Sequence, residues 1–174
     1  FAQKIPKFGG TLGVGWTSLA HSDLYKENVY IASLARLLQA NQDRKISVGV
    51  NVKMMEQWTN LDYLLNKNDP MAAQNKSKTV YTIDAGLWMR LKDKISIGLM
   101  AKNLTEPDIK RDTGANAVAD KVPMELHAGA ILHGLSSGAG KVAIIPGAEI
   151  TQRSGKTRFH VGAEMWFTGN NLAL

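Results

Sequence analysis

The sequence contains no cysteine and no long apolar run. Without cysteine the chain can form neither a disulfide nor a thiolate metal site, although many cellular compartments remain compatible with it. No apolar run approaches the roughly 20 residues that a transmembrane helix requires. The mean hydropathy of -0.17 is also far too low for a helical membrane protein. It does not exclude membrane-spanning strands, because half of each such strand faces a polar interior.

Charge of one sign does not dominate the chain. The formal net charge is +6, and the lysines and arginines are scattered instead of forming one patch, which argues against nucleic-acid binding. With 174 residues, 44% of them hydrophobic and 21% charged, the chain is long and apolar enough for one folded domain. It starts at Phe1 and shows no signal peptide, so we expect that a leader has been removed or that the N-terminus is missing.

Strict alternation of apolar and polar residues is the most informative feature. Over residues 44–54, Ile46, Val48, Val50, Val52 and Met54 share one parity, and polar residues or glycine occupy every position of the other. A period of two predicts a strand with one apolar and one polar face.

The same pattern recurs about eight times. The predicted strands span residues 10–19, 27–38, 45–57, 79–91, 94–103, 122–133, 141–150 and 157–167. Strands of about 10–12 residues exceed the usual soluble length of 5–6 and suit a membrane-spanning barrel. Pro146 interrupts the seventh strand and predicts a bulge or a strand edge, because proline cannot donate to the ladder.

The links between these strands differ in length. Those near residues 39–44, 91–94 and 133–140 are short, whereas residues 58–78 and 104–121 form long polar links. Outer-membrane barrels have short periplasmic turns and longer outside loops, which predicts that the two long links lie outside. The short link 151–156 would also lie outside.

The apolar face requires either lipid or a second protein layer. We expect a transmembrane antiparallel β-barrel, with a soluble β-sandwich as the alternative. The residues expected to face lipid are Ile46, Val48, Val50, Val52, Ile83, Leu87, Ile95, Ile97, Leu99, Leu126, Phe159, Val161 and Met165.

The opposite face carries charges of both signs. The residues expected to face the lumen are Lys53, Asp84, Arg90, Lys102, Glu125, His127, Glu149, Arg158, His160 and Glu164. They could select or conduct solutes, or they could pair with one another and fill the interior. His127 and His160 lack the spacing of a zinc site, so no metal or cofactor is predicted. No catalytic arrangement is apparent either, which argues against an enzyme.

The long links contain residues that could contact a partner. These candidates are Trp58, Leu61, Tyr63, Leu64, Leu65 and Pro107. The apolar residues of the first long link could instead form a short amphipathic helix packed on the barrel rim.

An ordered set of short segments supports a family resemblance. The segments cover residues 81–90, 94–104, 107–109, 122–130, 160–166 and 171–174. Their order and spacing resemble the FadL-type outer-membrane barrels, specifically the PorV/PorQ-like branch, across about residues 46–174. The resemblance implies a barrel of about fourteen strands, so residues 1–174 would be one β-barrel domain that is incomplete at one or both ends.

The resemblance also implies two functions in the outer membrane of a Gram-negative bacterium. One is a membrane component or scaffold of a secretion or surface-attachment assembly, acting through its extracellular loops on other protein subunits. The other is a FadL-like channel for a hydrophobic small molecule, although the N-terminal plug of such a transporter is not visible. A soluble structural β-domain is a further alternative. The sequence does not specify the cargo, the ligand or the partner proteins.

Overall fold

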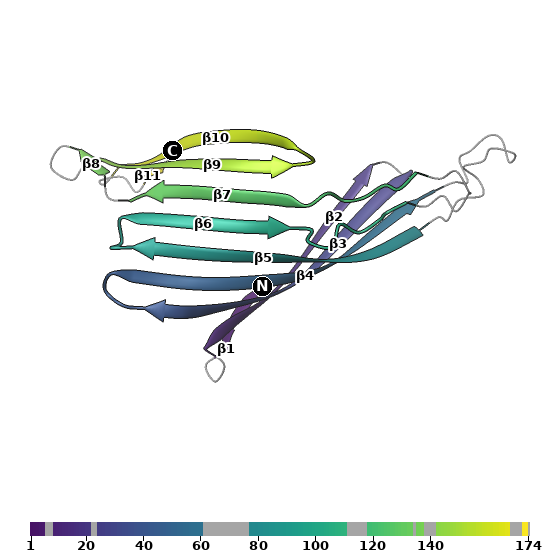
Figure 1. The fold of residues 1–174 in the computed structure, drawn as a ribbon, viewed down its shortest axis with the longest axis horizontal. Coiled ribbons are helices and arrows are strands. Elements are labelled where there is room, and N and C mark those ends of the chain that lie inside the picture. The colour runs from purple at the N-terminus through teal and green to yellow at the C-terminus, as the bar shows by residue number, and fades with distance from the viewer. Residues whose placement is uncertain are drawn as a thin grey trace, which may run out of the picture.

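The computed structural model describes residues 1–5, 9–21, 24–60, 77–110, 118–133, 135–137, 142–167 and 172–173. These residues form one antiparallel sheet of 11 strands (Figure 1). The strands are β1 (Ala2–Ile5), β2 (Gly10–His21), β3 (Tyr25–Ala40), β4 (Arg44–Thr59), β5 (Ser77–Leu91), β6 (Ile95–Lys102), β7 (Glu125–Leu132), β8 (Leu135–Ser137), β9 (Val142–Arg153), β10 (Lys156–Phe167) and β11 (Leu172–Ala173). Each strand pairs with its sequence neighbours, except that β7 and β8 both pair with β9.

The eight long strands confirm the all-β prediction from alternation. Most boundaries shift by one to three residues, and β7 begins at Glu125 instead of residue 122. The residues before β7 pair elsewhere, because the N–H of Val122 donates to the carbonyl of Pro107 at 2.9 Å. The short strands β1, β8 and β11 were not predicted, since two to four residues are too few to show a period of two.

Pro146 lies inside β9 at an interrupted part of the ladder. On one side it pairs in unbroken register with Ala163 of β10. On the other side, pairing with β7 ends at Gly147 and resumes with β8 at Ile144. Between these two paired segments there are three residues on the β7–β8 side but only two on β9. The register of pairing therefore shifts by one residue. The predicted irregularity is therefore confirmed, as expected of a residue that has no N–H to donate to the ladder.

The sheet is twisted and open. Figure 1 shows β2 and β3 crossing the strands from β6 to β10 at a steep angle. At one edge, β1 pairs with β2 only over residues 10–13. At the other edge, β11 pairs with β10 only at Trp166 and Phe167. Most of the outer edges of β2 and β10 thus have no strand partner among the described residues.

The residue types that are buried are the opposite of those buried in a water-soluble domain. Val80 is the sole buried hydrophobic residue in the described part of the chain. Apart from Gly10, the other buried residues there are all polar: Gln57, Thr82, Asp84, Ser96 and Asn103. Water-soluble domains bury apolar side chains and rarely bury an aspartate, so this sheet does not enclose an apolar core.

Candidate functional site on the polar face of the sheet

One face of the sheet is apolar across six adjacent strands. Residues paired across antiparallel strands share a face, so the register defines rows of neighbouring side chains. One row consists of Val48, Leu87, Leu99, Ala128, Ile150 and Phe159. A second row consists of Ile46, Met89, Ile97, Ala130, Ala148 and Val161. These rows form a continuous apolar surface from β4 to β10.

This apolar surface is bare. Leu99, Phe159 and Val161 are 49%, 76% and 86% exposed, so no second layer of described residues covers them. Of the thirteen residues predicted to face lipid, ten are exposed and three (Ile46, Ile95 and Ile97) are partly buried. An apolar surface this extensive marks an interaction with a membrane or another protein.

The opposite face carries the charged side chains. The register and the alternation place all ten residues predicted for the lumen on this face, for example Asp84 opposite Asn51 and Glu149 opposite His160. They form separate groups: Lys53 and Asp84 near one end, Arg90 near the other, and an acidic and histidine group on β7 and β9.

The most buried group centres on Asp84. Its Oδ1 lies 2.7 Å from Lys53 Nζ, and the two side chains are 4% and 11% exposed. The same oxygen accepts a hydrogen bond from the backbone N–H of Asn103 at 3.0 Å, and Oδ2 accepts one from Asn51 at 3.2 Å. Lys53 Nζ also donates to Asn103 Oδ1 at 2.6 Å. The buried carboxylate and ammonium are therefore paired and hydrogen-bonded, as buried charges require.

Asn103 starts a segment that folds back over this polar face. Asn103 has a positive φ of 55°, which turns the chain away from the β6 direction. Beyond it, Thr105 Oγ1 donates to Tyr81 O at 3.2 Å and lies 3.0 Å from Thr82 Oγ1. Thr82 is only 1% exposed as a result. We call the described residues 103–110 and 118–124 the strap.

The two arms of the strap are held together by Asp108. An isolated bridge pairs Asp108 with Lys121. Asp108 Oδ1 accepts the backbone N–H of Lys110 at 2.9 Å and that of Asp120 at 3.1 Å. The hydrogen bond from Lys110 is the main cause that lowers the pKa of Asp108 below its ordinary value of 3.8.

The lowered pKa predicts how the strap depends on pH. A carboxylate whose folded-state pKa is depressed contributes stability above its ordinary pKa, and that contribution is lost as the pH falls through the lowered value. Asp108→Asn should therefore increase amide exchange in the strap at neutral pH and change it little at a pH below the lowered pKa. Hydrogen exchange read by mass spectrometry measures this. Asp120→Asn removes an equal charge from the same segment and should leave exchange unchanged; an equal effect would contradict the role of Asp108.

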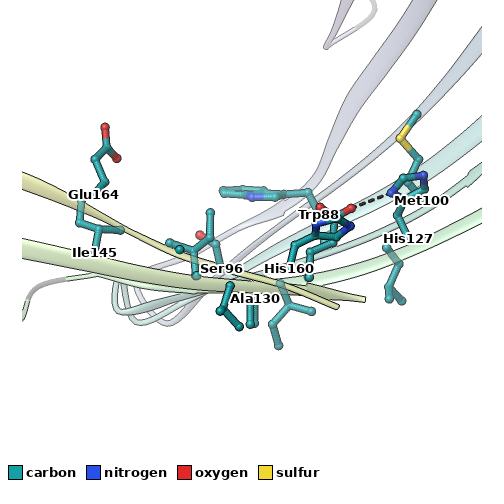
Figure 2. A pocket seen from close by; sticks show the side chains of 18 of the residues that line it. Trp88, Ser96, Met100, His127, Ala130, Ile145, His160 and Glu164 are labelled. Carbon is teal, nitrogen blue, oxygen red and sulfur yellow. Dashed lines mark hydrogen bonds and ion pairs between the residues drawn. The ribbon is translucent and has the colours of Figure 1, made fainter. Parts of the chain in front are cut away.

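A second polar group joins β7 to β9. His127 Nδ1 lies 2.6 Å from Glu149 Oε1, and its Nε2 lies 3.3 Å from Glu125 Oε2. Arg153 Nη1 lies 3.1 Å from the other oxygen of Glu125. Figure 2 shows His127 on the same side of the sheet as His160. Opposite charges are thus brought together on this part of the polar face.

A shallow hollow of about 870 Å³ lies over β5 to β10. In Figure 2, Trp88, Met100, His127 and Glu164 project from one side of the sheet, while Ala130 projects from the other. The hollow mixes aromatic, thioether and charged side chains. It is an open concavity and does not by itself define a ligand.

Sequence reasoning missed three uncharged members of the site and one arginine. Asn51, Thr82 and Asn103 form much of the Asp84 environment, and Arg153 neutralises Glu125. The parity of Asn51 was a usable signal, since it shares the polar face with Lys53. Of the loop candidates, Trp58 is 38% exposed at the end of β4, and Pro107 lies in the strap. Leu61, Tyr63, Leu64 and Leu65 lie outside the described residues.

No metal centre emerges from the described side chains. Across these residues, no group of three or more histidine, aspartate or glutamate side chains could hold a metal ion. No helix in the described ranges is long and apolar enough to cross a membrane.

Comparison with known proteins identifies a family. Residues 4–171 match the family model described as type IX secretion system membrane protein PorP/SprF. No curated protein and no solved structure matches the chain. The match supports the expected secretion-linked outer-membrane barrel and agrees only loosely with the PorV/PorQ-like branch; it does not support a FadL-type assignment. The chain belongs to the PorP/SprF family of type IX secretion system membrane proteins, and its location is the bacterial outer membrane.

Proposed function

We propose that this protein is an outer-membrane scaffold of a type IX secretion assembly, which contacts other envelope subunits through its extracellular loops. It acts without catalysis. The family description supplies the secretion system, and the bare apolar face beside a charged opposite face is the observation that supports a membrane-embedded scaffold.

The thirteen apolar residues predicted to face lipid would contact acyl chains, and the ten charged residues predicted for the lumen would point into the barrel interior. Ion pairs such as Lys53–Asp84 favour the interpretation that most of these charges compensate one another. In lipid every backbone N–H and C=O must be bonded internally. The outer edges of β2 and β10 therefore need strand partners, supplied by each other or by additional strands of one barrel domain that includes residues 1–174.

The strap favours a scaffold over an open channel. It covers the buried Thr82 and Asp84 at the end of the sheet where β4 ends and β5 begins. Part of the interior wall is therefore covered and does not line a path for a solute. A channel for a hydrophobic small molecule is the weaker alternative, with the hollow beside Trp88 as its candidate site. The soluble-domain alternative is not supported by membership of a membrane-protein family.

The scaffold role can be tested by replacing residues 62–75 with a glycine–serine linker in the native host. The replaced protein should still migrate faster unboiled than boiled, as a folded barrel does, but secretion should fall to the level of a strain lacking the gene. The matched control inserts the same linker between Ser154 and Gly155, in a short turn at the same end. Normal secretion by the first variant would refute a role for this loop.

A further inference from the structure

Two turns meet at the end of the sheet opposite the strap. The β3–β4 turn and the β5–β6 turn lie side by side at the left of Figure 1. The N–H of Lys92 donates to the carbonyl of Asp43 at 2.7 Å, and Lys45 Nζ lies 3.2 Å from Asp93 Oδ1. The side chain of Asn41 accepts the N–H groups of Asp43 and Arg44, which fixes the first turn. The two turns thus form one ordered surface.

This surface is strongly basic. We define the basic rim as Arg44, Lys45, Arg90, Lys92 and Lys94. Two carboxylates, Asp43 and Asp93, accompany these five cations, which leaves three unmatched positive charges. Asp93 Oδ1 is shared, because Arg90 Nε lies 3.1 Å from the same oxygen that contacts Lys45. Arg44, Lys92 and Lys94 are exposed, and within the described residues no ion pair neutralises them.

The second turn holds Lys92 in an unfavourable backbone conformation. Lys92 and Asp93 both have positive φ, 46° and 53°, and the N–H of Lys94 donates to the carbonyl of Leu91 at 2.9 Å. Turns with two positive φ values favour asparagine, aspartate and glycine, and a lysine there costs about 1 kcal/mol or more. The turn at the other end uses Ser154 and Gly155 in the same conformation. The basic rim therefore keeps Lys92 at a position where asparagine, aspartate or glycine fits better.

We propose that the basic rim docks an acidic surface of a periplasmic protein. The proposal rests on the membrane placement given above, which puts short turns on the periplasmic side. Lys45 and Arg90 are register partners on the polar face of the sheet, so they point away from the surrounding bilayer. Lys92 lies at the tip of its turn. A protein approaching along the barrel axis can reach Lys45, Arg90 and Lys92 together, whereas lipid headgroups around the barrel face the side of the sheet that carries Arg44.

Binding of a synthetic oligo-glutamate peptide to the full chain in zwitterionic nanodiscs tests the proposal. The double variant Lys92→Gln/Lys94→Gln should weaken binding about fivefold or more at low salt. It should also flatten the salt dependence, because exposed charges are screened by ions. The matched control Lys26→Gln/Lys156→Gln removes two exposed lysines from the opposite end and should bind like the unmodified protein.

Three results would overturn the proposal. They are equal weakening by the control variant, unchanged binding by the rim variant, and loss of peptide binding when phosphatidylglycerol is added to the nanodisc. The last result would assign the basic rim to lipid headgroups. Both variants should still migrate faster when unboiled than when boiled. If the unmodified protein itself never shows this faster migration, the membrane barrel is refuted instead. Lys94→Gln alone provides a milder variant, expected to weaken binding in the same direction.

Discussion

Leu99→Arg is expected to destabilise the folded protein in a lipid bilayer by about 2–4 kcal/mol, the range for a cation on the lipid face near the midplane of a barrel. Leu99 lies in the middle of β6 within the apolar row and is 49% exposed. If this face contacted water, the same substitution would change stability by only about 0.5 kcal/mol, since exposed surface sites tolerate charge. Urea unfolding in vesicles, followed by the shift between unboiled and boiled migration, measures the difference.

Met100→Arg is the matched control for this prediction. Met100 is the next residue on β6, and it projects into the hollow on the polar face (Figure 2). An arginine there remains in a polar interior, so the expected loss of stability is much smaller. Equal effects at Leu99 and Met100 would mean that the two faces have similar environments, and the barrel would be refuted.

Asp84→Ala is expected to destabilise the protein by about 3–5 kcal/mol, because it leaves the Lys53 ammonium buried without its partner. It also removes the acceptor for the backbone N–H of Asn103, where the strap begins. The strap should then separate from β5. Urea unfolding in vesicles measures the loss of stability, and a single cysteine reports on the strap.

Because the sequence contains no cysteine, a single introduced cysteine can report on the strap. Thr82→Cys, 1% exposed beneath the strap, should react slowly with a water-soluble maleimide in the otherwise unmodified protein and much faster when combined with Asp84→Ala. The double variant Lys53→Met/Asp84→Leu removes both charges and should recover much of the lost stability. Equally slow labelling in the presence of Asp84→Ala would show that other contacts hold the strap.

Alternation predicted the long strands because a period of two reflects two different environments. The predicted strands 45–57 and 157–167 became β4 and β10 with nearly the expected limits. The same alternation was sufficient to assign Leu99 and Met100 to opposite faces. Where the pattern was absent or short, as in β1 and β8, no prediction was possible.

The Asp84 group could be predicted only in part. Lys53 and Asp84 were both placed on the polar face, but their 2.7 Å contact depends on the register between β4 and β5. Asn103 was expected only at the end of a strand. Its positive φ and its bonds to Asp84 and Pro123 arise from the path of the strap, which no local pattern encodes.

The sequence by itself determined that this chain forms long two-faced strands, with apolar side chains on one face and charges on the other. It did so because side-chain direction alternates with every residue of an extended chain. Only the tertiary structure decided which charges pair, that the strap covers part of the polar face, and that two distant turns combine into the basic rim. These features depend on strand register and chain path, which bring together residues 30 to 50 positions apart in the sequence.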